Sequence, residues 1–117
     1  MRKVLLFSLL VASGCGLPQK DGPPALTAAY HAVLLSNGSV YFGKLEGLGS
    51  AFPTLSDVYY VQSNVNQETK AVNNVLVKRG KEWHGPDKMI INGTQIVFVE
   101  PVGPDSKVAA LIAESKK

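Results

Sequence analysis

Residues 32–45 read Ala-Val-Leu-Leu-Ser-Asn-Gly-Ser-Val-Tyr-Phe-Gly-Lys-Leu. Asn37-Gly38 lies between two β-prone runs, and this dipeptide is a strong hairpin signal because both residues tolerate the positive φ of a type I′ turn. The stretch therefore predicts two antiparallel strands, at residues 32–35 and 39–45, joined by a tight turn.

The chain beyond this hairpin contains further β-prone runs separated by turn residues. Three more runs are rich in β-branched and aromatic residues, and they predict strands at residues 54–62, 72–78 and 96–100. Residues 63–71 are polar and predict a long exposed hairpin tip, whereas residues 89–91 lead into a turn at Asn92-Gly93. Five short strands separated by turn signals predict a mainly β fold, a small closed or nearly closed barrel that leaves few free sheet edges.

A helix is expected after the last strand, over residues 104–117. Asp105 or Ser106 can cap its first turn by accepting hydrogen bonds from free backbone amides. Val108, Leu111 and Ile112 are spaced to lie on one helix face, which we expect to pack on the barrel.

Two apolar and glycine spacings give the domain its resemblance to a known fold. They are Val33-x-Leu35-x-x-Gly38-x-x-Tyr41-x-Gly43-x-Leu45, which is similar to the first Sm motif, and Ile91-x-Gly93-x-x-Ile96, which is similar to the second. The resemblance covers residues 30–102 and implies a five-stranded Sm-like, SH3-type barrel at residues 30–103. In such a barrel the alternate apolar residues of the first hairpin fill the interior, and Gly43 permits the sharp bend of a strand that serves two sides.

The departures from the Sm pattern concern nucleic acid. RNA-binding members of that family carry Asp and Asn in the loop after the second strand, and Arg before the glycine of the second motif. Here that loop is residues 49–53 and Asn92 stands in the Arg position. We therefore expect no nucleic-acid partner, and nucleic-acid binding remains the alternative. The resemblance also implies that the chain can form homo-oligomers.

The N-terminus predicts an exported protein. Basic residues Arg2 and Lys3 precede an apolar run over residues 4–12, which is shorter than the roughly 20 residues of a membrane-spanning helix. Residues 12–15, Ala-Ser-Gly-Cys, resemble the bacterial lipobox, which implies a signal peptide at residues 1–14 and a diacylglyceryl group on Cys15. Short bacterial lipoproteins with Sm-like barrels form a class that this chain resembles. The alternatives are an ordinary cleaved signal peptide and an uncleaved anchor helix.

Residues 15–29 are rich in Gly, Pro and polar residues, and we interpret them as a lipidated N-terminus and flexible linker. A loop packed on the domain is the alternative. Two acyl chains suffice for stable anchoring. The expected location is the cell membrane or the outer membrane, facing the periplasm or the cell exterior.

Charge and motif content narrow the function. The chain has 12 basic and 9 acidic side chains, so loss of Arg2 and Lys3 with the signal peptide leaves 10 against 9, a net charge of +1. That charge is too small to favour nucleic acid. No hydrolase, zinc or phosphate-loop pattern is present. His84 and Asp87 could supply two metal ligands and His31 a third, but a loop role for His84 and a turn role for Asp87 are favoured, and we expect neither metal nor cofactor.

Four residues are candidates for surface binding: Trp83, His84, Tyr59 and Arg79. Aromatic residues with basic neighbours are common at recognition sites, although a lone Trp more often covers the mouth of a barrel core. Tyr59 and Tyr60 must point to opposite faces of a strand, so that one of them is outside.

The expectation is a non-enzymatic, membrane-anchored lipoprotein of the cell envelope, acting as a structural or protein-binding module. Its partners would be membrane lipid through Cys15, an envelope protein and further copies of itself. An Sm-like nucleic-acid-binding protein and a small envelope enzyme are the alternatives.

Overall fold

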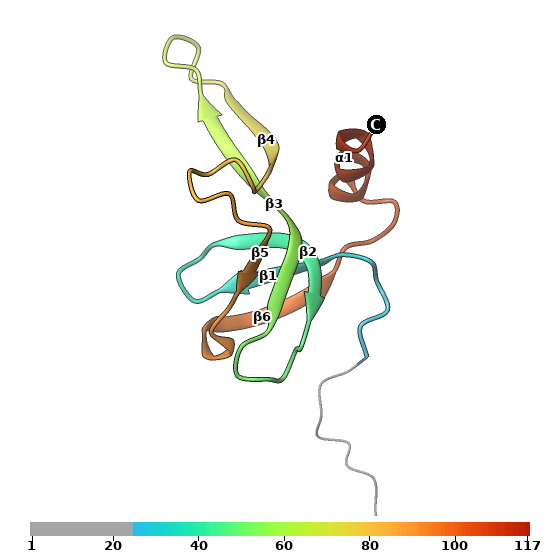
Figure 1. Ribbon diagram of the computed structural model, residues 1–117. Coiled ribbons are helices and arrows are strands. Elements are labelled where there is room, and N and C mark those ends of the chain that lie inside the picture. Colours follow the sequence, from blue (N-terminus) through green and yellow to red (C-terminus); the bar gives the residue numbers. More distant parts are fainter. Residues whose placement is uncertain (1–24) are drawn as a thin grey trace, which may run out of the picture.

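The computed structural model describes residues 25–117, which form one curved antiparallel sheet and one helix (Figure 1). The predicted signal peptide at residues 1–14, Cys15 and linker residues 16–24 lie outside the described residues. The elements in chain order are β1 His31–Leu35, β2 Val40–Glu46, β3 Thr54–Val65, β4 Val72–Lys78, β5 Lys88–Ile90, the short 3-10 helix η2 Gly93–Gln95, β6 Ile96–Pro101 and α1 Lys107–Ser115.

The β1–β2 hairpin is present, but its turn is not of type I′. Gly38 donates to the carbonyl of Leu35 at 2.9 Å, and Leu35 donates to the carbonyl of Ser39 at 2.9 Å. Only Gly38 has positive φ, at +89°. The loop is therefore a three-residue turn with glycine at a bulge position. Asn37 instead accepts a hydrogen bond from the backbone of Ser39 at 2.9 Å through its side chain, which does not need the left-handed conformation.

Strand β3 is the centre of the sheet because it changes partners along its length. Residues 54–59 pair with β2, and residues 59–65 pair with β4. Within the region paired with β2, a bulge between Ser56 and Tyr59 places Asp57, with φ of +51°, opposite Gly43. A Cβ at Gly43 would lie 2.8 Å from both the Leu55 side chain and the Ser56 carbonyl. Only glycine fits where β2 passes this bulge, in line with the bend expected there.

The sheet has six strands rather than the expected five, and it is not closed. The strand order is β4-β3-β2-β1-β6, and β5 pairs with the free side of residues 54–56 of β3. Within residues 25–117 no ladder joins β6 to β4 or β5. The reason is that β4 pairs with residues 59–65, the second half of β3, which projects from the sheet. Only the three residues of β5 pair with the first half of β3 on that side.

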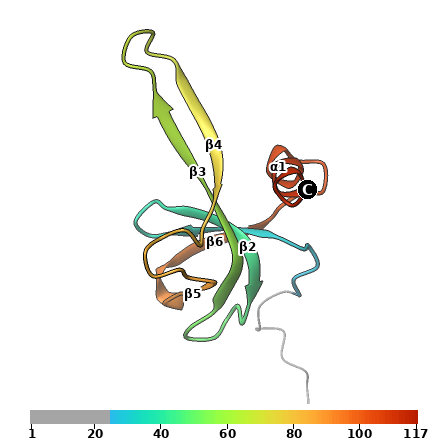
Figure 2. The same ribbon diagram turned by 45° about the horizontal axis from the view of Figure 1, so that its top comes forward.

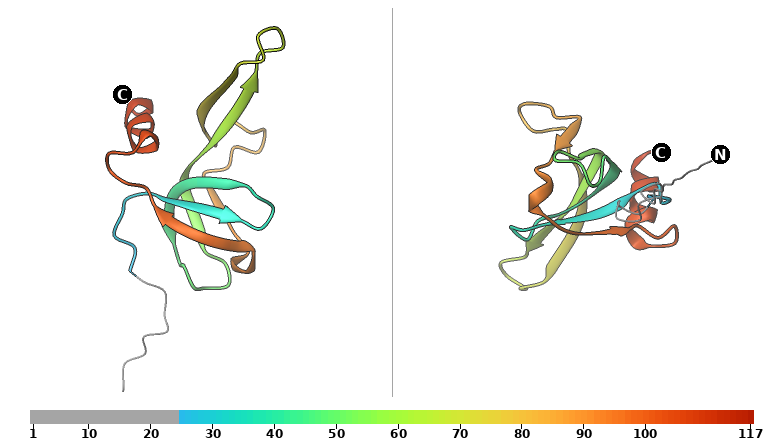
Figure 3. Two further views of the ribbon diagram at one scale, coloured as in Figure 1. Left: turned by 180° about the vertical axis from the view of Figure 1, so that it is seen from behind. Right: turned by 90° about the horizontal axis from the view of Figure 1, so that it is seen from below.

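The core lies inside the curve of the sheet. Its buried members are Val33, Leu45, Leu55, Val58 and Ile91. The half-buried side chains of Leu35 and Tyr41 pack against them, so the alternation predicted for the first hairpin is confirmed. Seen from below, the strands curve around a common centre (Figure 3).

Two segments outside the sheet also attach to it. Leu26 packs against the core, so the last part of the predicted linker belongs to the domain because it supplies an apolar side chain. Helix α1 begins as predicted, with the Ser106 side chain accepting from the backbone of Ala109 at 3.1 Å. Of its predicted apolar face only Ile112 is fully buried, whereas Leu111 keeps 38% of its surface exposed.

The outer part of the β3–β4 hairpin projects from the sheet, and we call residues 61–77 the arm (Figures 1 and 2). Strand β3 extends into the region predicted as a loop, so that only residues 66–71 form the turn. Val61 pairs with Leu76 and Val65 with Val72, which puts four apolar side chains on one face of the arm. A groove of about 210 Å³ separates this face from Leu111 of α1.

Candidate functional site

The loop between β4 and β5, residues 79–87, contains a tight turn that carries Trp83. The backbone of Gly85 donates to the carbonyl of Glu82 at 2.8 Å, so Trp83 and His84 occupy the two corner positions. We call residues 82–85 the Trp83 turn. The Trp83 side chain is as exposed as it would be in an isolated peptide, at 106%, and His84 is exposed as well.

The base of the loop is fixed to the sheet. Arg79 donates from its backbone to the carbonyl of Val58 at 2.8 Å. The Glu82 carboxylate accepts from the backbone of Gly80 at 2.9 Å, and this hydrogen bond lowers the pKa of Glu82. The Trp83 turn therefore has a defined position relative to β3.

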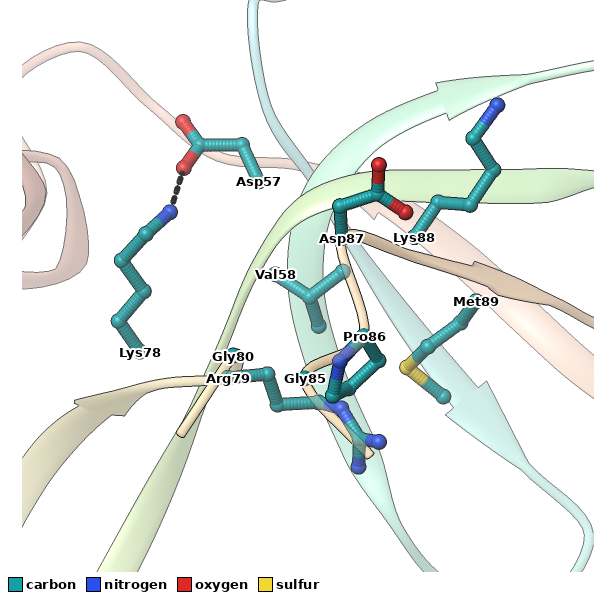
Figure 4. Close-up of a pocket in the computed structure, with 10 residues that line it drawn as sticks. All are labelled: Asp57, Val58, Lys78, Arg79, Gly80, Gly85, Pro86, Asp87, Lys88 and Met89. Carbon is teal, nitrogen blue, oxygen red and sulfur yellow. Dashed lines mark hydrogen bonds and ion pairs between the residues drawn. The ribbon is translucent and has the colours of Figure 1, made fainter. Parts of the chain in front are cut away.

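A cavity of about 460 Å³ lies between this loop and the bulge of β3 (Figure 4). Asp57 and Val58 line it from the bulge, while Arg79, Pro86 and Met89 line it from the loop and β5. Figure 4 shows the Arg79 side chain extending past Pro86, and Lys78 turned toward Asp57. The walls carry both signs of charge, so the cavity does not favour one class of charged ligand.

The Asp57 carboxylate is the polar centre of the fold. It accepts hydrogen bonds from the Tyr30 hydroxyl, just before β1, and from the ammonium group of Lys78 at the end of β4. The Lys116 ammonium, at the end of α1, lies 2.8 Å from the same carboxylate. The side chain of Asp57 is only 15% exposed. One carboxylate thus ties three separate segments to β3.

These contacts set the protonation of the group. Partial burial raises the pKa of Asp57, but the hydrogen bonds from its three donors lower it by more, so its pKa lies well below its ordinary range. Burial and the hydrogen bond to this carboxylate raise the pKa of Tyr30 to about 12. The same carboxylate raises the pKa of Lys116. Asp57 is therefore an ionised structural group at neutral pH, not a proton donor.

Arg79 is held against the sheet. Its guanidinium group lies over the ring of Tyr41, 5.9 Å from the centroid, and 3.7 Å from the Glu82 carboxylate. Its Nε is buried and has no hydrogen-bond partner within the described part of the chain. Arg79, which was expected to be a surface contact, therefore lines the cavity, and only 20% of its side chain is exposed.

Two expectations about aromatic residues are wrong. Trp83 does not cover the core, because it is fully exposed, as the surface-binding candidate would be. Tyr59 is not on the surface: it is 1% exposed, its ring contacts Tyr30 edge to face, and its hydroxyl lies 3.2 Å from Ser115 of α1. Its neighbour Tyr60 is half-buried on the other face of β3. The sequence could not decide which of the two faces the core, because both residues are tyrosine.

The histidines do not meet. His31 is buried on β1, at 4% exposure, whereas His84 is in the exposed turn. Among residues 25–117 no three His, Cys, Asp or Glu side chains lie close enough to hold a metal ion.

Sequence reasoning missed Asp57 and its partners. The local sequence around Asp57 reads as an ordinary strand, and a polar residue inside a predicted strand was the one available signal. Its hydrogen-bond donors Tyr30, Lys78 and Lys116 are separated from it by 27, 21 and 59 positions in the sequence, and no local pattern connects residues so far apart.

No protein-family model matches the chain. No curated protein matches it either. In residues 25–117 we find no helix with the length and apolar character needed to cross a bilayer.

Proposed function

We propose that this protein is a membrane-anchored lipoprotein of the cell envelope, tethered through Cys15, whose sheet serves as a non-enzymatic structural or protein-binding module. The leader supports the anchor, since a basic start, a short apolar run and small residues precede the only cysteine of the chain. The observation that carries the binding role is the arm, whose apolar face leaves Val61, Val65 and Val72 about half exposed or more.

The arm has the features of a partner-binding surface. Val61, Val65 and Val72 share one face and are 47%, 52% and 62% exposed. Among the strands of residues 25–117, β4 pairs only with β3, so its outer edge offers backbone donors and acceptors to a further strand. The partner on this surface is an envelope protein or a second copy of the chain.

The finer fold assignment, an Sm-like small barrel, belongs to the same proposal. It is supported by the burial of Val33 and Leu45 from the first motif and by the close passage of Gly43 at the bulge. Because the base-contacting residues of that family are not matched here, we expect no shift of single-stranded RNA in a gel at low salt. A shift would favour the nucleic-acid alternative.

The anchor is tested by metabolic labelling with a radioactive fatty acid in the native host. The wild-type chain should incorporate label, and the Cys15→Ala variant should incorporate none. Equal labelling of both would refute lipidation at this residue.

The arm is tested by a photo-crosslinking amino acid placed at Val65, on the apolar face, and at Asn64, on the opposite face of the same strand. Both positions are exposed, so the comparison controls for accessibility. We expect one saturable crosslinked species from position 65 alone, and its mass distinguishes a second copy from another protein. Equal crosslinking from both positions would contradict a binding role for this face.

A further inference from the structure

The Trp83 turn combines a projecting aromatic ring with a basic surrounding. Residues 78–88 contain Lys78, Arg79, Lys81 and Lys88 against Glu82 and Asp87, a balance of four positive to two negative side chains. Glu82 is engaged at the base of the loop by Gly80. Lys78 is paired with Asp57 and Arg79 with Glu82, so the positive charge that this loop offers to a partner comes from Lys81 and Lys88.

The shape of the turn distinguishes between classes of partner. Trp83 stands at a convex corner, and the residues beside it in the turn, Glu82 and His84, are polar. A protein hot spot needs a surrounding ring of contacts that excludes water from the central side chain. A lipid interface can close around one projecting ring, and the indole N–H stays at the level of the headgroups.

The turn is also presented on a firm support. Its base is hydrogen bonded to Val58 of the core strand and within the loop to Glu82, so little conformational freedom is lost on contact. The loop lies on the other side of the sheet from α1, and no other element covers it in either view (Figures 1 and 2).

We propose that the Trp83 turn is a membrane-contact site that places its indole in the headgroup region of an anionic bilayer, with Lys81 and Lys88 next to the lipid phosphates. The contact goes beyond the anchor proposed at Cys15 and does not require it. A lipid-anchored domain with such a contact has two attachments to the bilayer, which fix the direction in which the arm faces.

The sequence provides its own reporter, because Trp83 is the only tryptophan. The experiment mixes the full chain carrying Cys15→Ala with vesicles of phosphatidylcholine and phosphatidylglycerol, some with acyl chains brominated close to the glycerol. Emission from Trp83 should move to shorter wavelength and fall by roughly half with brominated lipid, as expected for an indole at the interface. Vesicles of phosphatidylcholine alone should give a smaller change, and added salt should reverse the effect.

Two matched controls separate this contact from binding through the leader. The double variant Trp83→Phe, Phe52→Trp moves the reporter to another exposed aromatic position, 64% exposed, in the β2–β3 loop. Its emission should stay unquenched on the same vesicles. Lys81→Gln should weaken the partition of the turn about fivefold, whereas Lys117→Gln, at another exposed site beyond α1, should not change it.

The proposal would be overturned if the emission wavelength of Trp83 on anionic brominated vesicles were the same as in water. Equal quenching of the reporter at position 52 would also overturn it. Because the readout comes from position 83 in a chain without Cys15, its failure leaves the fatty-acid labelling test of the anchor unaffected.

Discussion

At the scale of single residues, Asp57 carries the largest structural role. Its φ of +51° is allowed at low cost for Asp and Asn but not for most residues. Its carboxylate receives Tyr30, Lys78 and Lys116 while being mostly shielded from water. The bulge that carries it is thus both a bend in β3 and the attachment point of the segments on either side.

Replacing Asp57 by Asn should lower the free energy of unfolding by about 2 kcal/mol, because hydrogen bonds to a shielded charged group are lost while the backbone conformation remains accessible. Urea denaturation followed by circular dichroism measures the change. Lys117→Met is the control, because it removes an exposed lysine next to Lys116 that makes no contact with Asp57. It should have little effect on stability. Equal stabilities of Asp57→Asn and the wild type would contradict this role.

Stability should depend on pH through the same group. The pKa of Asp57 is depressed in the folded state, so its contribution is complete above the ordinary value of about 3.9 and is lost as the pH falls below it. The pKa of Tyr30 is raised to about 12, so stability is also lost as the pH rises from about 10 through that value. Denaturation midpoints measured across pH should show both declines.

In the Asp57→Asn variant both declines of stability with pH should be shallower, because Tyr30 and Lys116 no longer contact an ionised carboxylate. An unchanged pH profile in this variant would show that other groups control the two transitions.

At the scale of elements, the packing of β2 on β3 depends on the close approach of the two backbones at Gly43. The bulge turns β3 out of the curved sheet and lets its second half pair with β4. Helix α1, by contrast, is held by one buried side chain, Ile112, and by the contacts of Lys116 and Ser115.

Gly43→Ala should destabilise the protein by about 1–3 kcal/mol, since the added methyl group meets backbone and side-chain atoms of β3 at 2.8 Å. Gly103→Ala is the matched control, because nothing lies within 4 Å of a Cβ there. Thermal unfolding of the two variants gives the comparison. A similar melting temperature for both would show that β3 can yield at the bulge.

At the scale of the whole molecule, the structure consists of a packed centre and two outlying parts. The centre contains β1, β2, β6 and the first half of β3, with the buried side chains between them. The arm and α1 extend from it, and the arm consists of exposed residues over most of its length.

Hydrogen exchange should reflect this division. Amides of β1, β2 and residues 54–59 should exchange slowest, while amides of the outer arm and of α1 should exchange through local opening. Mass spectrometry of peptides after timed exchange resolves these segments. Uniform protection across all of them would mean that the arm and helix open only with the centre.

Several elements could be predicted because the signals are local. The strand at residues 72–78 has the predicted bounds, and Ser106 caps the helix as one of the two expected residues. The sixth strand was missed because three residues are too few to show a period. The interpretation that Trp83 covers the core was wrong, because the sequence neighbours of a tryptophan do not distinguish a turn corner from the mouth of a core.

The sequence by itself determined the alternation of the first hairpin, the positions of the main strands and the start of the helix, since these follow from side-chain period, turn residues and capping. Only the tertiary structure decided that the sheet stays open, that Tyr59 is inside and that Asp57 gathers three donors. These features depend on where β3 exchanges one partner for another. That point is set by a bulge and by contacts between residues up to 59 positions apart, which no short stretch of sequence contains.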